Sequence, residues 1–483
     1  MTHRPATPPI SRRTLLLAGG AGLAATALHW GGAVRAEPAM RKYALKPMPA
    51  MANIVGAEHP DTAIWGYNGI APGPELRLRQ NEILEVAVEN GIDQPTTLHW
   101  HGIRLPNAMD GVPGVTQDAI APGGRFTYRF AVPDAGTYWY HPHLGASEQI
   151  GRGLYGPLIV EEPEPIRVDR ELVWLLDDWR LGRDAQILDG FDDLHDKTHG
   201  GRIGNTLTLN GKLTESVPVR AGERLRLRLI NVANGRLFSL DFQGHNPQII
   251  ALDGHPVTPH APQGGRLTLG PGMRADIVLD LQGKPGERFE VIDRFYPQFV
   301  YRFVTLAYSD DAPLRDSPLD APILLAANNL PVPDLADAQQ ESLLFGGGMM
   351  SQMASARLDG RTVDMREMLR HGIAWTMNGE AHAADASHHH PTLFKVKQGR
   401  TCRLKMTNDT AWYHPIHLHG HVFRVISRNG QPVKDDAFLD SVLLAPRETA
   451  EIAFVADNPG RWMLHCHVLE HQSAGMMGLI EVG

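Results

Sequence analysis

One short segment occurs three times in this chain, and this repeat constrains the fold more than any other feature of the sequence. Apolar and polar residues alternate within each copy, which is typical of β-strands, and regularly spaced turns are typical of β-sandwiches or barrels. The three copies predict three β-domains with boundaries near residues 165 and 315. In each copy a turn residue stands nine positions before an asparagine: Asn81 and Asn90 in "LRLRQNEILEVAVEN", Gly222 and Asn231 in "VPVRAGERLRLRLIN", Gly399 and Asn408 in "FKVKQGRTCRLKMTND".

Histidine pairs follow two of these asparagines at the same distance. Nine and eleven residues after Asn90 and Asn408 the chain has histidine, whereas the middle copy has Leu240 and Phe242. A second match aligns "GTYWYHPH" with "GRWMLHCH" and places Cys466 opposite Pro142. The chain has six H-x-H pairs against roughly one expected by chance. The four matched pairs are His99/His101, His141/His143, His417/His419 and His465/His467.

The matched pairs predict a metal centre between the first and third domains. Residues i and i+2 of a strand face the same side, so each pair offers two imidazoles to one region. Cys466 points the other way and is available to a separate metal. His471 and Met476 follow it closely and His414 opens the motif "HPIHLHGH", and two imidazoles, a thiolate and a weak thioether are typical of a blue-copper site. Zinc has no redox chemistry and seldom needs so many histidines.

The sequence resembles the three-domain multicopper oxidases of the bacterial laccase and copper-resistance type. The matching motifs are "WGYNGIAPGP", "HWHG", "MDGVPGVTQ", "HPH", "HPIHLHGH" and "HCHVLEHQSAGMM", which extend over nearly the whole mature chain. The resemblance implies an all-β chain of three cupredoxin-like Greek-key β-sandwich or barrel domains. They would comprise residues 37–165 (trinuclear ligands), 166–315 (a metal-free spacer) and 316–483 (blue copper and trinuclear ligands).

The resemblance also implies four copper ions and a ligand set. Electrons from a reducing substrate would enter at the blue copper and pass through Cys466 to a trinuclear cluster, where dioxygen is reduced to water. The type 1 copper would be held by His414, Cys466, His471 and Met476, the type 2 copper by His99 and His417, and the two type 3 coppers by His101, His141, His143, His419, His465 and His467.

The cluster also needs a source of protons. Asp110 in "HGIRLPNAMDG" matches the family's acidic position, although an aspartate also suits a turn rich in glycine and proline. Some bacterial relatives have a glutamate immediately after the last blue-copper histidine, where this chain has Gln472. We therefore expect Asp110 and water to carry more of the proton relay. His421 and Asp440 are expected to be exposed, with no role assigned.

Two donor classes stay open, Cu(I) and phenolic or other aromatic compounds. Six of the 16 methionines fall between Met349 and Met377, within a Met-rich segment (residues 345–377). Thioethers prefer Cu(I), but methionines also fill gaps in packing. Trp412 and Tyr413 precede His414, where cuprous oxidases often have methionine and acid, and aromatic residues there suit an organic ring. His388, His389 and His390 are either metal-collecting residues or a solvated loop.

The N-terminus predicts export. Arg12 and Arg13 precede a Gly/Ala-rich apolar run that ends in "AVRA", which looks like a twin-arginine signal over residues 1–36 and indicates a periplasmic protein. Removing that segment removes four arginines and no acid, which leaves 42 basic against 54 acidic residues, a net charge of −12. Such a surface disfavours nucleic acid as a partner. We expect a monomer without a membrane span once the signal is removed.

Three alternatives have different signatures. Structural relatives that act in cell division have lost the cysteine and histidines, all of which are present here. Copper nitrite reductases distribute their ligands differently over two domains. A copper uptake or storage protein would use the methionines without turnover, and steady oxygen consumption would exclude it.

Overall fold

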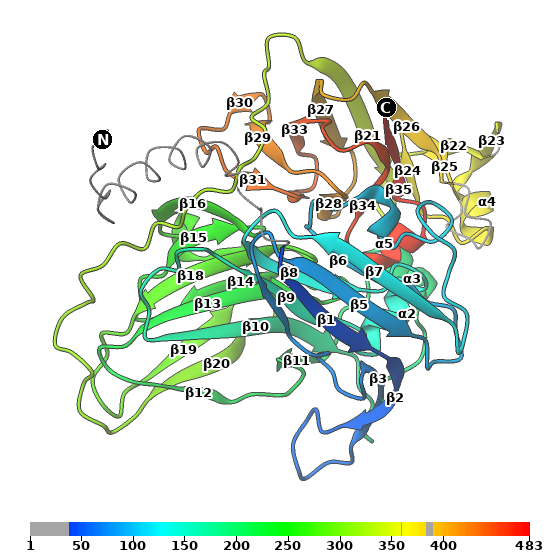
Figure 1. Cartoon of the computed structure of the whole chain (residues 1–483). Coiled ribbons are helices and arrows are strands. Elements are labelled where there is room, and N and C mark those ends of the chain that lie inside the picture. The colour runs from blue at the N-terminus through cyan, green and yellow to red at the C-terminus, as the bar shows by residue number, and fades with distance from the viewer. Residues whose placement is uncertain (1–37, 359, 383–389) are drawn as a thin grey trace, which may run out of the picture. The chain divides into compact units, whose positions relative to one another are not determined.

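The alternating sequence patterns become β-strands almost throughout the chain, which confirms the all-β prediction. The structure is a computed structural model, and it describes residues 38–358, 360–382 and 390–483 (Figure 1). The predicted export signal, with Arg12 and Arg13, and the histidines His388 and His389 lie outside the described residues. Residues Met40–Gly483 form one unit by their contacts.

The strands fall into three consecutive sets. The first set is β1 (Met40–Leu45), β2 (Pro47–Ala52), β3 (Thr62–Tyr67), β4 (Leu76–Arg79), β5 (Ile83–Glu89), β6 (His99–His101), β7 (Arg125–Ala131), β8 (Gly136–His141) and β9 (Gly156–Glu161). The middle set is β10 (Arg170–Trp179), β11 (Thr206–Leu209), β12 (Ser216–Val219), β13 (Arg224–Asn231), β14 (Phe238–Phe242), β15 (Gln248–Leu252), β16 (His255–His260), β17 (Leu267–Leu269), β18 (Arg274–Asp280), β19 (Arg288–Asp293) and β20 (Tyr301–Tyr308).

The third set is the longest and carries the C-terminal histidine motifs. It comprises β21 (Gln339–Gly347), β22 (Ser355–Leu358), β23 (Arg361–Asp364), β24 (Trp375–Met377), β25 (Glu380–Ala381), β26 (Thr392–Val396), β27 (Thr401–Asn408), β28 (His414–Leu418), β29 (Phe423–Arg428), β30 (Gln431–Pro432), β31 (Phe438–Leu439), β32 (Ser441–Leu444), β33 (Thr449–Val455), β34 (Gly460–Cys466) and β35 (Met477–Val482).

Within the described ranges, strands pair only inside their own set. The predicted boundaries near residues 165 and 315 fall in the connecting segments. The helices are short: α2 (Ala146–Gly151), α3 (Leu194–Thr198), α4 (Met365–Arg370), α5 (Leu469–Ser473) and the 3-10 turns η1 (Asn107–Met109) and η2 (Gln263–Gly265). Among the residues that the structure describes, no helix has the length and apolar character needed to cross a membrane.

The three sets repeat one topology. Each contains a parallel pair that includes the repeat strand, β1 with β5, β10 with β13 and β21 with β27. A second sheet in each set contains another parallel pair, β4 with β9, β12 with β20 and β26 with β35. The strands that carry the matched histidines, β6 and β28, correspond in this order to β14, which carries Leu240 and Phe242.

The repeat asparagines build the same corner three times. The turn residues Asn81, Gly222 and Gly399 have φ of 69°, 75° and 82°, a left-handed conformation that favours glycine and asparagine. Each repeat asparagine then accepts a bond from the backbone N–H two residues on and donates to two backbone oxygens. Strands β13 and β27 end at Asn231 and Asn408, and Asn90 directly follows β5.

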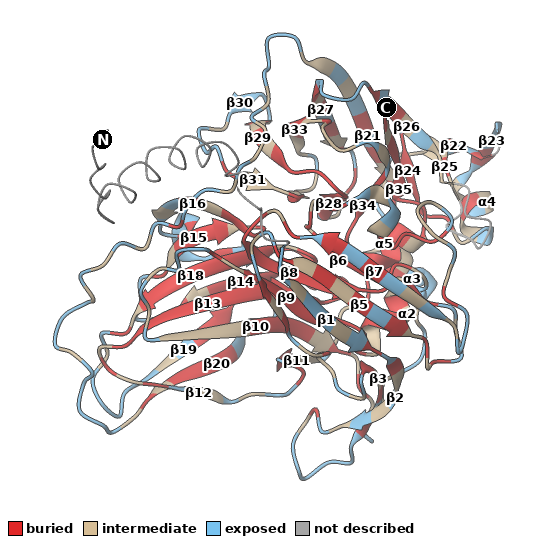
Figure 2. Ribbon diagram, in the orientation of Figure 1, coloured by how far each residue is buried: buried red, intermediate tan, exposed pale blue. Residues whose placement is uncertain are grey.

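The middle set is buried on both faces of its central strand. All eight residues of β13 are buried, although its sequence alternates arginine and leucine. Arg226 donates to Glu162 at 2.6 Å and to Asp276 at 2.6 Å, so its charge is paired inside the protein. Thr137 of β8 also donates to Asp276, at 2.6 Å. The polar face of β13 therefore packs against the first set, and Figure 2 shows β13 as buried.

Candidate copper centre

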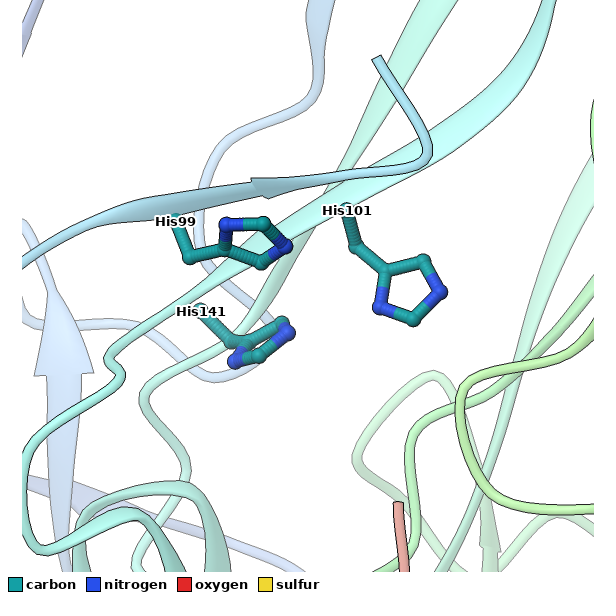
Figure 3. A group of neighbouring side chains, drawn as sticks. All are labelled: His99, His101 and His141. Atoms are coloured by element: carbon teal, nitrogen blue, oxygen red, sulfur yellow. The ribbon is translucent and has the colours of Figure 1, made fainter. Parts of the chain in front are cut away.

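The eight histidines of the matched pairs come together in the interior. Each is at most 6% exposed. Strand pairing places His99 of β6 opposite His141 of β8, and His417 of β28 opposite His465 of β34. Figure 3 shows His99 and His101 on one strand beside His141 from its neighbour, with their rings close together. The first and third sets thus contribute four imidazoles each to one region.

The rings divide into groups that suit separate metal ions. His143, His419 and His465 have ring centroids 5.0 to 5.2 Å apart. His101, His141 and His467 form a second group with centroids 5.0 to 5.8 Å apart. The two remaining rings, His99 and His417, lie 6.0 Å apart and border both groups. The closest ring pairs cross these groups, with centroids 3.7 Å apart for His101 and His417 and 4.0 Å apart for His99 and His419, so the eight rings form one continuous cluster.

Hydrogen bonds fix most of these rings with Nε2 directed inward. The Nδ1 atoms of His99, His417, His141 and His465 donate to backbone oxygens at 2.8 to 3.0 Å. Their neutral rings then present an Nε2 lone pair, because one ring nitrogen donates and the other accepts. Burial lowers the pKa of His141 and His465 well below the usual value, which keeps these rings neutral.

The inward nitrogens have no protein partners. Buried ring nitrogens of His99, His101, His141, His143, His417 and His467 lack a hydrogen bond, and leaving so many buried polar atoms unpaired is unfavourable. His419 Nε2 and His465 Nε2 face one another at 3.1 Å, and both rings have Nδ1 bonded elsewhere. Two lone pairs at that distance repel unless a cation lies near them. The residues therefore fit copper.

His101 is held the opposite way round. Its Nε2 lies 3.2 Å from Asp440 Oδ1, and its Nδ1 is the unpaired atom. The expectation that Asp440 and His421 are exposed is wrong, since they are 0% and 3% exposed. Asp440 lies under the histidine cluster, and the His421 ring packs against Phe454 and Trp462. Neither position follows an alternating strand pattern that would have marked it as buried.

Asp110 lies at the edge of the cluster. Its Oδ2 accepts from His419 Nδ1 at 2.9 Å, its Oδ1 lies 3.3 Å from His99 Nδ1, and it is 1% exposed. It thus contacts one ring of the group His143, His419 and His465 and one ring of the pair His99 and His417. A cavity of about 130 Å³ approaches the cluster at His143, and Gln472 and Met463 line it as well.

A second donor group lies on the other side of β34. Cys466 Sγ is 3.5 Å from His414 Nδ1 and 3.6 Å from His471 Nδ1, and the two nitrogens are 3.0 Å apart. His414 Nε2 donates to Thr410 Oγ1 at 2.8 Å and His471 Nε2 to the His199 oxygen at 2.6 Å, so both Nδ1 lone pairs point at the sulfur.

Burial shapes this second group further. It raises the pKa of the Cys466 thiol, which favours the thiol over the thiolate until a cation takes the proton's place. Met476 is fully buried, and its backbone oxygen accepts from the Cys466 N–H at 3.0 Å. Cys402, in contrast, is buried in β27 and belongs to the hydrophobic core. Two imidazoles and one thiolate in this arrangement fit a blue-copper site.

One tryptophan packs on both histidines of the second group. The Trp375 ring centroid lies 4.3 Å from that of His471 and 5.0 Å from that of His414, and its Nε1 donates to the Lys197 oxygen at 2.7 Å. A Cβ at Gly348 would lie 2.1 Å from the indole, so the glycine run before the methionines leaves room for this ring. Trp375 was not identified from the sequence.

A wide cavity adjoins this site. Its volume is about 1190 Å³, and its wall includes α3 with His195 and His199. The His199 ring lies 5.2 Å from the ring of Trp412. The aromatic residues of the wall are Phe295, Tyr296, Phe299, Trp412 and Tyr413.

The Met-rich segment is mostly packed. Met368 and Met377 are buried, and Met353 and Met365 pack against a small core formed by β22, β23 and α4. Met349 and Met350 are exposed by 48% and 68%. The Met349 N–H donates to the Thr198 oxygen at 2.8 Å, and its own oxygen accepts from Trp412 Nε1 at 3.1 Å. The two exposed methionines, Met349 and Met350, thus follow a backbone contact with the end of α3.

The all-β fold and the two donor groups define a copper protein with a cupredoxin-type site. Profiles of the multicopper oxidase family match residues 50–165, 170–295 and 362–483. The chain belongs to the multicopper oxidase family. It is an oxidoreductase that couples one-electron oxidation of a reducing substrate to the reduction of dioxygen to water.

The chain also aligns with individual relatives over most of their length. The chain is 34% identical to the multicopper oxidase MmcO of Mycobacterium tuberculosis, over 89% of this chain and 85% of that protein. It is 27% identical to a copper resistance protein A homolog of Pseudomonas syringae, over 86% and 88%. A solved multi-copper oxidase of Pseudomonas thermotolerans shares 36% identity and a TM-score of 0.80, over 92% of this chain and 100% of that one.

Proposed function

We propose that this chain holds four copper ions and that a phenolic or other aromatic donor reduces the mononuclear one. His414, Cys466, His471 and Met476 would hold the type 1 copper. His99 and His417 would hold the type 2 copper. The remaining histidines, His101, His141 and His467 on one side and His143, His419 and His465 on the other, would hold the type 3 pair. The bound copper supplies one-electron redox chemistry, and the protein supplies its geometry.

The facing lone pairs are the observation that carries this proposal. Ring nitrogens of His414 and His471, and of His419 and His465, point at a common space, while the outer nitrogens of these four rings are committed to hydrogen bonds. Two carbonyl oxygens, one hydroxyl and one carboxylate thus fix the tautomers before any metal arrives. Elemental analysis of the copper-loaded chain should give four ions per chain. A value of one or two would refute the assignment.

The chain's own residues would also connect the two sites. His465 and His467 flank Cys466 at the end of β34, so the thiolate faces the mononuclear site while its neighbours face the cluster. Two peptide segments therefore join the sulfur to the cluster ligands. Asp110, whose Oδ2 accepts from His419 Nδ1 at 2.9 Å, would relay protons at the edge of the cluster that receives dioxygen.

The aromatic wall of the wide cavity favours an organic donor. Phe295, Trp412 and Tyr413 offer rings on which a phenol can stack. The donor would then lie beside His199, whose backbone oxygen accepts from His471. Four of the six methionines in the segment are occupied in packing and are not free to bind a cuprous ion.

A specific observation still favours Cu(I) as a second donor. Met349 and Met350 are exposed next to α3, where a thioether-bound cuprous ion would lie near the same histidine. Because the rest of the segment forms strands and α4, point substitution tests this better than deletion. Met349→Leu with Met350→Leu should leave oxygen uptake on a phenol unchanged. If the double variant no longer takes up oxygen on Cu(I), Cu(I) is the physiological donor. If oxygen uptake on Cu(I) is unchanged, the aromatic compound is the donor.

We further propose export to the periplasm through the twin-arginine route, followed by action in copper tolerance or laccase-like oxidation. The arginine pair and the small-residue end of residues 1–36 support the route. Replacing Arg12 and Arg13 by lysine should retain the protein in the cytoplasm. Unaltered export of that variant would point to a general secretory signal.

A further inference from the structure

The middle strand set reaches the histidine cluster through one buried arginine. Arg274 begins β18 and is 0% exposed. Its Nη1 and Nη2 donate to the two oxygens of Asp440 at 2.8 and 2.6 Å, a bidentate pair. Asp440, from the third set, is the carboxylate that contacts His101 Nε2 at 3.2 Å. The middle set therefore acts on a histidine of the first set through a carboxylate of the third.

We propose that Arg274 is a positioning residue for the trinuclear site, because it holds Asp440 where that carboxylate selects the Nδ1-presenting tautomer of His101. This inference rests on the proposed copper centre. It assigns the middle set a direct part in forming the site, beyond the role of a metal-free spacer.

The contrast between His101 and its neighbours supports this. His99, His141, His417 and His465 bond outward through Nδ1 to backbone oxygens, and His417 Nδ1 also lies 3.3 Å from Asp440 Oδ1. His101 bonds outward through Nε2, and its partner is a side chain. A backbone carbonyl is held by the fold itself, whereas a buried carboxylate keeps its place and its charge only if something pairs it.

Arg274 is itself tightly fixed. Its Nε donates to the Thr137 oxygen at 3.2 Å and its Nη2 to the Asp253 oxygen at 2.9 Å. Asp253 completes the frame from the other side, since its Oδ2 accepts from the backbone N–H groups of Asp440 and Ser441 at 3.3 and 3.0 Å. The Asp440 side chain and backbone are thus both bound by residues of the middle set.

The backbone before β18 also approaches the cluster. Gly272 has φ of 82°, and a Cβ there would lie 2.8 Å from His467 Cδ2 and 2.9 Å from His101 Cε1. The N–H of Gly272 donates to the oxygen of the repeat asparagine Asn231 at 2.9 Å. The corner that carries no histidines therefore directs this glycine, and Arg274 two residues later, against two ligands of one type 3 group.

The test compares two buried arginines of the middle set. Arg274→Met and the control Arg226→Met each remove a paired charge, and Arg226 contacts Glu162 and Asp276 but no histidine of the cluster. After copper loading, crystals are measured at the copper absorption edge, which gives the occupancy of each site. The visible band of the mononuclear site reports whether each variant is folded.

We expect Arg274→Met to lose copper selectively within the cluster, most at the site of His101, His141 and His467 and less at the site of His417, whose Nδ1 lies 3.3 Å from Asp440 Oδ1. Copper affinity should fall roughly 10- to 100-fold at the first site, while the mononuclear band persists. Arg226→Met should lower thermal stability without selective loss of copper. Arg274→Lys keeps the positive charge but does not form the bidentate pair, so it should lose less copper than Arg274→Met. It also tests the inference if Arg274→Met does not fold.

A second measurement needs no metal. Nitrogen-15 spectra of labelled apoprotein should show His101 protonated on Nε2, and Asp440→Asn should shift it toward the Nδ1-protonated form. Full occupancy in both Arg274 variants, or equal copper loss at all sites, would overturn the inference. Fewer than four coppers in the unmodified chain would instead count against the proposed copper centre.

Discussion

His471 Nε2 lies 2.6 Å from the backbone oxygen of His199, so a proposed ligand of the mononuclear site is bonded to the residue that follows α3. The bond leaves Nδ1 of His471 facing Cys466 and places the His199 peptide between that ligand and the wide cavity. Trp375 Nε1 bonds the neighbouring Lys197 oxygen, so two side chains of the third set hold α3 in place. A donor in the cavity then meets His199 before it meets His471.

Removing an aromatic wall residue should weaken donor binding without changing the copper sites. Phe295 contacts Tyr413 with ring centroids 5.2 Å apart and lies in the cavity wall. Phe295→Ala is expected to raise KM for a simple phenol about 5- to 10-fold, because an aromatic contact contributes about 1 kcal/mol. Oxygen uptake measures this, and Phe242→Leu, in the core of the middle set, is the control. An unchanged KM would place the donor elsewhere.

Loss of the Cys466 thiolate should remove one copper and the blue colour together. Cys466→Ser is expected to bind three ions instead of four, because serine keeps the shape but does not supply the soft ligand. Visible absorption and copper content are the measurements. Cys402→Ser changes the other buried thiol, which lies in the hydrophobic core, and should leave both values unaltered. A blue Cys466→Ser protein would contradict the mononuclear assignment.

Neutralising Asp110 should slow oxygen reduction but not the reduction of the mononuclear copper. Asp110→Asn retains an oxygen for the 2.9 Å contact with His419 and loses the ionisable carboxyl, and we expect turnover to fall about 100-fold or more. Stopped-flow bleaching by the donor should keep its rate. Adding Gln472→Glu restores a carboxyl in the cavity that reaches His143 and should recover part of the loss. Normal turnover in Asp110→Asn would leave that residue only a structural role.

Acid should destabilise the apoprotein through its buried histidines. Burial lowers the pKa of His421 to about 4, so this ring stays neutral in the folded state and gains a proton near pH 6.5 in the unfolded chain. The unfolded state therefore binds more protons between pH 6.5 and 4. Stability is lost as the pH falls through this window, by on the order of 3 kcal/mol at its lower end.

His421→Phe should remove that dependence. The ring packs between Phe454 and Trp462, where a phenyl ring has similar shape. The difference in Tm between the variant and the unmodified apoprotein should therefore grow in the variant's favour from pH 7 to pH 4.5. A pH-independent difference would show that His421 does not titrate in this range.

The sequence predicted the features that repeat. Three copies of one strand predicted the three strand sets, and the matched H-x-H pairs predicted the histidine cluster, because period-two alternation fixes which residues share a face. Arg274 and Asp440 could not be found this way. Asp440 is 339 residues from His101 and 166 from Arg274, and both contacts depend on how the sets pack together. Trp375 and His199 were missed for the same reason.

The Met-rich segment shows a second limit of prediction from sequence. Its composition was read correctly, yet composition does not say which thioethers face a core. Met368 is buried in a cluster formed by β22, β23 and α4, whereas Met350 is exposed to solvent. Whether a methionine is available as a metal ligand or only packs in the core depends on its tertiary environment.

The asparagine corner belongs to the fold and contributes no histidine. Asn90, Asn231 and Asn408 make the same bonds to backbone in all three sets, and none of those bonds involves a histidine. A copy of the unit can therefore gain or lose its ligands while its strand ends at the same place. In the middle copy Leu240 and Phe242 occupy the freed positions, which makes this set a ready scaffold on which an engineer could introduce a new pair of imidazoles.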